Sequence, residues 1–419
     1  MAPPGEILFL AHRVPFPPDR GDKIRSHNLL RALAALGPVH VGTFGESEAD
    51  MCQAPELERI AASHCLVRRR MPVPLAALEA LAAGKPVSLP AFASSRMANW
   101  VRRTLTERPI GAIVVFSGQM AQYLPRQFDG PVLMDFVDVD SAKFEDYARR
   151  APIGLAAMYR REARLLAAFE ASVARRATAN SLASRAEAAL FAERLAAAGV
   201  AARVIALDNG IDTAAFDPSR VAPRIVGAAA TVPHIVFTGQ MDYPPNGEAV
   251  TMFAREVMPL IRAKKPGAQF DIVGRAPTAA VRALDGVHGT RVHGAVQDVR
   301  PWLADATLVA APLLIARGVQ NKVLEAMAMA RPVLATTAAA TGIDARDGIE
   351  IAIADGAEAL AARALDLLAK PRVRQRMGKA ARARVVAERS WEAAFAPLAG
   401  LIGAGSVAAV PAGTARDAA

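Results

Sequence analysis

The sequence predicts an α/β protein with two doubly wound domains, each built on a parallel sheet and facing the other across a cleft. Short apolar runs alternate with helical stretches along most of the chain, and strands that alternate with helices pair in parallel. This alternation stops in a segment rich in Pro, Gly and small residues, at 218–233, and then starts again. The length of 419 residues also exceeds what a single hydrophobic core usually serves.

The first series of apolar runs predicts a sheet covered by helices on both faces. Strands are expected at 6–11, 39–44, 112–117, 131–137, 176–181 and 203–208. The first helix is expected over 21–37, where an amphipathic run ends at glycine.

The second series repeats this pattern. Strands are expected at 234–239, 269–274, 290–295, 307–313, 331–337 and 349–354, with helices at 246–264 and 321–330. The predicted organisation is an N-terminal domain over 1–217, a linker over 218–233, a C-terminal domain over 234–385, a helix over 386–403 and a disordered tail over 404–419.

The composition excludes several classes of protein. Cys52 and Cys65 are the only cysteines and have no metal-ligand spacing, so we expect a reducing, cytoplasmic environment with no disulfide and no zinc site. The N-terminus has no basic leader, so no signal peptide is predicted. The uncharged stretch 393–415 is rich in Ala and Gly and is interrupted by Pro397 and Pro411, so we do not expect it to span a membrane.

The net charge of +10 indicates anionic partners. Aromatic residues make up only 5% of the chain and no nucleic-acid-binding motif accompanies the charge, so nucleic acid is not an expected partner. The basic residues leave two interpretations open. They form solvated helix surfaces, or they form a face that rests on an anionic membrane surface.

The stretch "RGVQNKVLEAMAMA" (317–330) follows an expected buried strand and carries the chemistry of a phosphate site. Gly318 allows the backbone to approach a ligand, and the start of the following helix binds anions through its free N–H groups. Arg317 and Lys322 add positive charges suited to a diphosphate. Glu325, expected in the first helical turn, can accept hydrogen bonds from two vicinal hydroxyls such as those of a ribose. The alternative is an ordinary helix start with a solvated Glu–Lys pair.

Several motifs, in order along the chain, resemble one known family. They are "MDFVDVDSAKFEDYA" (134–148), "LDNGIDTAAFDP" (207–218), "FTGQMDYPPNGEAVTMFAREVMPLI" (237–261), "DIVGRAP" (271–277) and "GVQNKVLEAMAMARPVLA" (318–335). The chain is similar to GT-B glycosyltransferases of family 4, in particular the sugar transferases associated with PEP-CTERM/exosortase exopolysaccharide loci. The resemblance implies two Rossmann-like domains, with a C-terminal helix around Trp391 that packs back on the first.

The resemblance implies roles for residues of the second domain. Glu325 matches the second acid of the family's Glu-x7-Glu motif, which contacts the donor's ribose, whereas Arg317 occupies the position of the first acid. We interpret Arg317 as a contact to the diphosphate that replaces the missing acid. The other predicted donor-binding residues of this domain are Gly239, Arg275, Gly318, Asn321 and Lys322.

In the first domain, the loop "AHRVPFPPDRGDKIRSHNLL" (11–30) matches the family's loop between the first strand and helix. Gly21 is expected to give its amide to the donor phosphate. Arg13, Arg20 and Lys23 are expected to steer a phosphate-bearing acceptor, or else to form a solvated basic loop. His12 and His27 are weaker candidates, and His27 is interpreted as structural because it falls within the helix.

The acids Asp135, Asp138 and Asp140 follow an expected strand. We expect Asp138 and Asp140 to act as a base or to hold sugar hydroxyls, near the place where many relatives have a histidine. A divalent metal is an alternative that the family does not favour. A further alternative is that Asp140 or Ser141 caps the next helix.

The predicted function is transfer of a hexose-type sugar from a nucleoside-diphosphate donor to a lipid-linked or oligosaccharide acceptor in exopolysaccharide synthesis, with retention and without cofactor or metal. Motifs of dehydrogenases, P-loop ATPases, zinc proteases and α/β-hydrolases are absent from the sequence. Two alternatives remain open: a GT-B sugar-nucleotide epimerase, and a non-catalytic GT-B subunit of a polysaccharide assembly complex.

Overall fold

The computed structural model describes residues 5–69, 80–81, 83–224, 232–316 and 319–403. The chain forms two compact units, Met1–Asp208 together with Phe395–Ala419, and Asn209–Ala394. The boundary at Asp208 precedes the predicted linker 218–233, and 225–231 within that linker lie outside the described residues.

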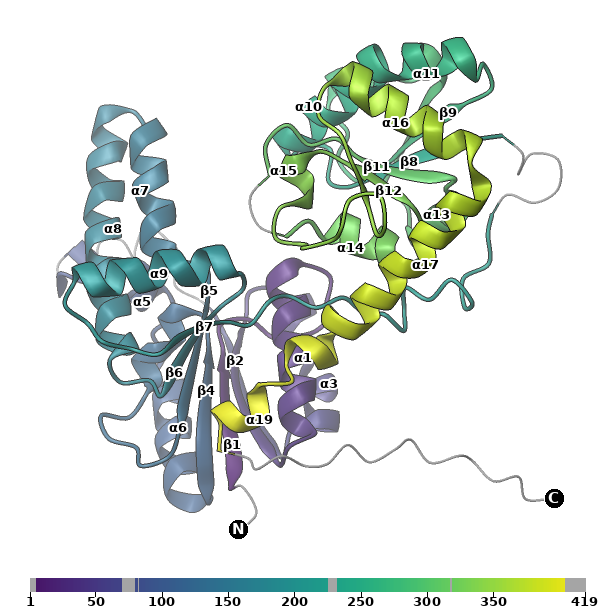
Figure 1. The fold of residues 1–419 in the computed structure, drawn as a ribbon. Helices are drawn as coiled ribbons and strands as arrows, with labels where there is room; N and C mark the ends of the chain where they lie inside the picture. Colours follow the sequence, from purple (N-terminus) through teal and green to yellow (C-terminus); the bar gives the residue numbers. More distant parts are fainter. Residues whose placement is uncertain (1–4, 70–79, 82, 225–231, 317–318, 404–419) are drawn as a thin grey trace, which may run out of the picture. The chain divides into compact units, whose positions relative to one another are not determined.

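The first unit contains a parallel sheet whose seven described strands run in the order β3-β2-β1-β4-β5-β6-β7 (Figure 1). This order reverses direction between β1 and β4, as in doubly wound folds. The strands are β1 (Glu6–Ala11), β2 (Val39–Gly45), β3 (Ser63–Arg68), β4 (Ile110–Phe116), β5 (Val132–Val137), β6 (Ala179–Leu182) and β7 (Val204–Ala206).

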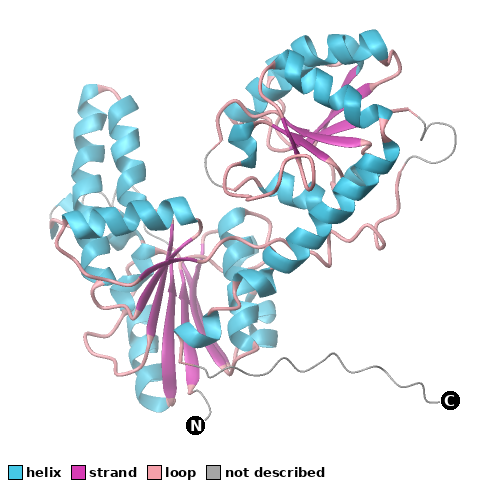
Figure 2. Cartoon of the chain, viewed as in Figure 1, coloured by secondary structure: helices cyan, strands magenta, loops and turns pink. Residues whose placement is uncertain are grey.

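Helices lie on both faces of this sheet (Figure 2). The described helices are α1 (Gly21–Ala34), α2 (Glu48–Met51), α3 (Ala54–Ile60), α5 (Ser88–Ala91), α6 (Ser95–Glu107), η1 (Gly118–Tyr123), α7 (Asp140–Arg150), α8 (Ile153–Ala174), α9 (Arg185–Ala197) and α19 (Leu398–Leu401). The core of this unit surrounds the central strands. Five of the six residues of β1 are buried, and so are all seven of β2, as expected for a parallel sheet covered on both faces.

The second unit has a parallel sheet of six described strands in the order β10-β9-β8-β11-β12-β13. The strands are β8 (His234–Thr238), β9 (Gln269–Val273), β10 (Thr290–Gly294), β11 (Leu308–Ala311), β12 (Val333–Ala335) and β13 (Ala352–Ile353). The described helices are α10 (Pro244–Met252), η3 (Phe253–Val257), α11 (Met258–Lys264), α12 (Ala279–Arg282), η4 (Val287–Gly289), α13 (Arg300–Asp305), α14 (Asn321–Ala328), α15 (Thr337–Ala340), α16 (Ala357–Ala369), α17 (Pro371–Glu388) and α18 (Trp391–Ala394).

Two departures from the predicted elements have local causes. The helix predicted over 246–264 starts earlier, at Pro244, and contains a π-helical turn over Phe253–Val257. This turn precedes Pro259, which has no N–H for the carbonyl one turn earlier. The helix predicted over 386–403 is instead interrupted between α18 and α19, where Pro397 stands.

The C-terminal segment contributes to both units. Trp391 packs on Gly210 in the second unit, where a Cβ on the glycine would lie 2.7 Å from the Trp391 backbone. Phe395 belongs to the first unit, where its ring centroid is 5.7 Å from the Arg25 guanidinium. No helix in the described part of the chain is long and apolar enough to cross a membrane.

Candidate functional site

In the second unit, the strand order changes direction between β8 and β11. Crevices at such switch points, beyond the carboxyl ends of the strands, are where open parallel sheets bind ligands. The loop after β8 leads into α10, and the loop after β11 leads into α14. The residues predicted to bind the donor in this unit that the structure describes are Gly239, Arg275, Asn321, Lys322 and Glu325, and all of them follow carboxyl ends of its strands.

Glycines let the loops after β8 and β9 touch. The Gly239 amide donates to the Val273 carbonyl at 3.1 Å. A Cβ on Gly274 would lie only 1.6 Å from the Gly239 carbonyl oxygen, so no other residue fits at this position. A Cβ on Gly239 would lie 2.9 Å from the Asn246 amide nitrogen. The backbones of the loops that follow β8 and β9 are therefore closely packed against each other.

Lys322 is held in place by residues of β8 and α10. Its ammonium donates to the Asn246 side-chain oxygen at 2.5 Å and lies 4.6 Å from the centroid of the Phe237 ring. The buried Asn246 side chain in turn donates to the Gln240 carbonyl at 2.8 Å. Burial lowers the pKa of Lys322 to about 8, while the Glu325 carboxyl opposes this shift. The ammonium is thus held in place without a full counter-charge.

Glu325 is the fifth residue of α14, so the prediction that it lies in the first turn is wrong. Its carboxyl is half-buried, and burial raises its pKa to about 7 against the opposing effect of Lys322. Among the described residues, none donates a hydrogen bond to this carboxyl and none forms an ion pair with it. A solvated Glu–Lys pair therefore does not describe these two side chains.

The remaining predicted donor-binding residues differ in position. Asn321 is exposed at the start of α14. Arg275 is exposed after β9 and its guanidinium donates to the Gln240 side chain at 2.9 Å, which places a second cation beside the loop that follows β8. Arg317 and Gly318 lie outside the described residues.

In the first unit, Gly21 is the first residue of α1 and lies after β1. The preceding residue, Arg20, has an extended backbone and provides no side-chain cap. A Cβ at Gly21 would meet no atom within 4 Å. The helix start is therefore open on this side, which suits the approach of an anion.

Arg13 and Arg20 belong to an ion-pair network around Asp22 and Glu46. The Arg13 guanidinium lies 2.6 Å from Asp22 and 3.1 Å from Glu46, and that of Arg20 lies 3.2 Å and 3.6 Å from the same two acids. Burial raises the pKa of Asp22, but hydrogen bonds with His12 and Arg13 outweigh it and hold the pKa well below its ordinary value. The simple interpretation as a solvated basic loop is therefore incomplete.

The prediction that Lys23 contacts the acceptor does not fit the structure. Lys23 is buried, and its ammonium donates to Asp50 at 2.7 Å and to the Phe16 carbonyl at 3.2 Å. Burial at an otherwise apolar position requires such a partner. The residue therefore has a structural role that joins α1 to α2.

The three acids after β5 have separate environments. Asp135 is buried and accepts a hydrogen bond from Arg25 at 3.0 Å. Asp138 and Asp140 are partly exposed, and both lie near the Lys143 ammonium, at 2.8 Å and 3.2 Å. No group of three or more His, Cys, Asp or Glu in the described ranges could hold a metal ion.

The predicted capping of α7 by Asp140 or Ser141 is wrong, because both residues lie within the helix. The free N–H groups at its start are satisfied by distant acids. Glu187 accepts from the Val139 amide at 2.8 Å, and Glu170 accepts from the Ser141 amide at 3.0 Å and from its hydroxyl at 2.6 Å. Burial raises the pKa of Glu170 to about 7, although its bonds to Ser141 oppose the shift.

Breaking the buried pair of Arg25 and Asp135 should destabilise the first unit. We expect Arg25→Ala to lower the free energy of unfolding by about 3–5 kcal/mol, since it leaves a buried carboxylate without its cation. The double variant Arg25→Met with Asp135→Leu should recover most of this loss. Urea unfolding measures both, and an Arg25→Ala variant within about 1 kcal/mol of wild type would contradict the assignment.

Sequence reasoning gave too little weight to His12, which follows β1. Its ring stacks on Phe116 with centroids 5.7 Å apart, and its Nε2 lies 3.4 Å from Asp22. Its Nδ1 is buried without a hydrogen-bond partner. Nearby strand ends carry unusual backbones, because Ser117 after β4 has φ 76° and Val137 at the end of β5 has φ 72°. Strained non-glycine residues cluster at functional sites, and no sequence pattern signalled these two.

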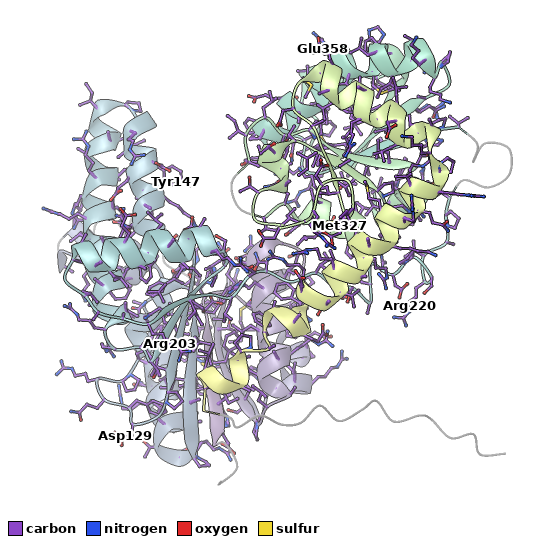
Figure 3. The ribbon with its side chains drawn as sticks, in the orientation of Figure 1. Asp129, Tyr147, Arg203, Arg220, Met327 and Glu358 are labelled. Atoms are coloured by element: carbon purple, nitrogen blue, oxygen red, sulfur yellow. The ribbon has the colours of Figure 1, made fainter. Side chains whose placement is uncertain are left out.

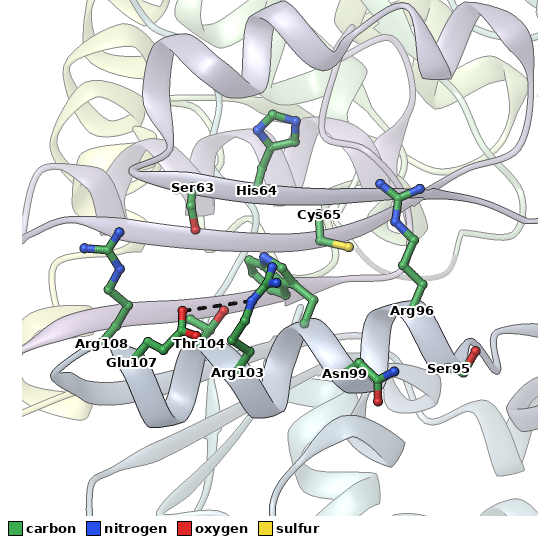
Figure 4. A pocket seen from close by; sticks show the side chains of 11 residues that line it. Ser63, His64, Cys65, Ser95, Arg96, Asn99, Arg103, Thr104, Glu107 and Arg108 are labelled. Atoms are coloured by element: carbon green, nitrogen blue, oxygen red, sulfur yellow. Dashed lines mark ion pairs between the residues drawn. The ribbon is translucent and has the colours of Figure 1, made fainter.

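A further hollow lies elsewhere in the first unit. A cavity of about 960 Å³ lies between β3 and α6 and is lined by Cys65, Arg96, Asn99, Trp100 and Arg103, among others (Figure 4). It runs beside the edge strand and contains none of the predicted site residues.

A known protein family matches most of the second unit. Residues 232–370 match the family described as glycosyl transferases group 1. No curated protein sequence matches the chain.

Solved structures resemble the whole chain. HepE from Anabaena, solved with UDP and glucose, has a TM-score of 0.60 at 14% identity over 95% of this chain and 99% of its own. Sucrose-phosphate synthase from Thermosynechococcus elongatus has a TM-score of 0.61 at 18% identity over 95% and 98%. WaaG, described as a glycosyltransferase involved in lipopolysaccharide biosynthesis, has a TM-score of 0.60 at 18% identity over 95% and 100%. The two Rossmann-like domains therefore form a GT-B fold.

Proposed function

We propose that the chain is a glycosyltransferase whose second unit holds a nucleoside-diphosphate sugar at the start of α14. The observation that carries this proposal is the pair Lys322 and Glu325 on one helix at the switch point of the sheet, a fixed ammonium and a carboxyl to which no described residue donates a hydrogen bond. The match to group 1 glycosyl transferases and the likeness to HepE, solved with UDP and glucose, support it.

The two side chains have different tasks. Lys322 and the N–H groups at the start of α14 stabilise the charge that develops on the leaving diphosphate. Arg275 adds positive charge beside the loop that follows β8, and Arg317 is proposed as a further contact to the diphosphate. Glu325 accepts hydrogen bonds from the donor's ribose hydroxyls, for which two carboxylate oxygens without a donor among the described residues are suited. The lack of a side chain at Gly239 lets Asn246, which holds Lys322, approach the loop after β8.

The first unit supplies the acceptor side in this proposal. His12 and Asp138 are candidates to hold sugar hydroxyls or to take a proton from the acceptor, while Gly21, at its open helix start, is proposed to give its amide to the donor phosphate. Asp140 supports Asp138 through their shared contact with Lys143. Arg13 and Arg20 attract a phosphate-bearing acceptor.

We also propose the type of sugar, the acceptor and the stereochemistry of transfer. The sugar is of hexose type, and the acceptor is a lipid-linked precursor of an exopolysaccharide. Transfer proceeds with retention, because the leaving diphosphate assists attack from its own face, and it needs no metal.

The affinity for a nucleoside diphosphate should be greatest between about pH 7 and about pH 8. Below the Glu325 pKa of about 7 the carboxyl is protonated and loses acceptor capacity, and above the Lys322 pKa of about 8 the ammonium loses its charge. Calorimetry across this range should show Glu325→Gln removing the acidic limb and Lys322→Met removing the alkaline limb. Titration of the nucleotide's own phosphate is common to all variants and cancels. Identical profiles in wild type and both variants would exclude these groups.

A thermal-shift screen of UDP-, GDP-, ADP- and dTDP-sugars tests the proposed function. At about 100 times Kd, a ligand of the folded state adds about 2.7 kcal/mol, so one nucleotide family should raise the melting temperature by several degrees. The selected donor should then react only when an acceptor is present. Epimer formation from donor alone would indicate an epimerase, and binding without turnover would indicate a non-catalytic subunit. No shift with any donor would refute the proposal.

A further inference from the structure

The helices α7 and α8 form an antiparallel hairpin that extends from the sheet of the first unit (Figure 1). They are joined by a short turn at 151–152. At the base of the hairpin, one face of α8 is buried, including Glu162, Leu166 and Glu170. Toward the turn the hairpin loses these contacts.

The tip of the hairpin is apolar although it faces solvent. Ile153 is 89% exposed, Met158 53%, Tyr147 52% and Leu155 41%. Other exposed large apolar side chains of the described chain are spread over many elements, whereas these four lie within twelve consecutive residues. Singly exposed apolar residues need no explanation, but a group of them at one place marks an interaction site.

Aromatic side chains lie next to the apolar tip. Phe144, Tyr147 and Tyr159 pack against one another with ring centroids 5.7–5.8 Å apart. Figure 3 shows Tyr147 on the outside of the hairpin. Tyrosine is favoured at the level of lipid headgroups because its ring is amphipathic.

Arginines follow the aromatic side chains. Arg160 and Arg164 on α8 are exposed, whereas Arg149 on α7, although exposed, pairs with Asp146. Two nearby acids have other partners, since Glu145 pairs with Arg194 and Glu162 accepts from the Val87 amide at 2.8 Å. The outer surface of this part of α8 is therefore positive.

The spacing along α8 matches a bilayer surface. Ile153 to Met158 spans about 7.5 Å at a rise of about 1.5 Å per residue, and Arg164 lies about 9 Å further along. Interfacial helices bury apolar side chains about 5–10 Å deep and keep their cations at the level of the phosphates. The order of apolar tip, aromatic ring and arginine follows the change in polarity from acyl chain to headgroup.

We propose that the tip of the α7–α8 hairpin inserts into the surface of an anionic lipid bilayer. Ile153, Leu155 and Met158 enter the acyl boundary, and Arg160 and Arg164 contact the phosphates. Only the tip enters the bilayer surface, and the hairpin does not span the membrane. The inference deepens the proposed function by giving a lipid-linked acceptor a docking place, but it rests on this surface and not on the donor site.

Vesicle sedimentation tests the proposal, with vesicles of phosphatidylcholine alone or with about one third phosphatidylglycerol. Wild type should bind the anionic vesicles. Ile153→Ser with Met158→Ser should lower the partition coefficient at least about tenfold. Arg160→Gln with Arg164→Gln should lower it about fivefold per arginine on anionic vesicles and leave phosphatidylcholine binding unchanged.

The matched control is Leu260→Ser with Ile349→Ser, which removes similarly exposed side chains from the second unit and should bind vesicles as wild type does. All variants should keep the nucleotide-sugar thermal shift, which separates failure of this proposal from failure of the proposed function. Three results would overturn it: no binding of wild type to anionic vesicles, unchanged binding of the Ile153/Met158 variant, or self-association through the tip in place of vesicle binding.

Discussion

Lys322→Ala should lower kcat about 100- to 1000-fold with little loss of stability. The ammonium is held by Asn246 and Phe237 beside the start of α14, where the proposed function puts the leaving diphosphate. Removal of one such preorganised donor from a partly buried site costs about that factor. The fold should tolerate the change because the side chain is half-buried and burial already disfavours its charge. Steady-state kinetics with the donor found by thermal shift measures the effect.

The matched control is Lys264→Ala, which removes an exposed lysine from α11 and should keep wild-type kinetics. Asn246→Ala should have a smaller effect in the same direction, because it releases the ammonium without removing it. A Lys322→Ala enzyme with wild-type kcat would mean that the diphosphate does not contact this residue.

Glu325→Ala should weaken nucleoside-diphosphate binding about 10- to 100-fold. A hydrogen bond to a charged group contributes about 1.5–3 kcal/mol. No described side chain donates a hydrogen bond to the Glu325 carboxyl, so its removal should affect ligand binding and not the fold. Calorimetry with a ribonucleotide and its 2′-deoxy analogue identifies the group that is contacted. Wild type should prefer the ribonucleotide, and the variant should lose that preference.

Glu358→Ala, on α16 of the same unit, provides the control because its carboxyl is exposed and should not influence binding (Figure 3). If Glu325→Ala retained the wild-type preference for the ribonucleotide, the assignment of Glu325 to the ribose would be wrong. Glu325→Gln separates charge from shape, since it keeps one acceptor oxygen.

The sequence predicts the strands well because each buried strand is a short apolar run. The exception is β3, whose residues "SHCLVR" are mixed in polarity because the strand lies at the edge of the sheet. The strand predicted at 176–181 is observed at Ala179–Leu182. The long helix α8, which ends at Ala174, precedes it. Neither the length of a helix that packs on neighbours nor an edge strand is visible in local periodicity.

The sequence suggested where to propose a donor site because the proposed residues lie close together in one motif. The contacts that hold the residues of this site could not be predicted from the sequence. Asn246 reaches Lys322 from 76 residues away, and only the fold brings the two together. In the same way, nothing local shows that Lys23 meets Asp50 or that Asp135 meets Arg25. The sequence alone therefore does not distinguish a charged residue that binds substrate from one that forms a buried ion pair.

The most direct measurement is a crystal structure of the protein with the nucleoside diphosphate that gives the largest thermal shift. The account predicts phosphate oxygens within hydrogen-bond distance of the Lys322 ammonium and the first N–H groups of α14, and ribose hydroxyls on Glu325. A nucleotide bound elsewhere, for example in the cavity between β3 and α6, with Lys322 still on Asn246 and Glu325 without a ligand, would contradict it.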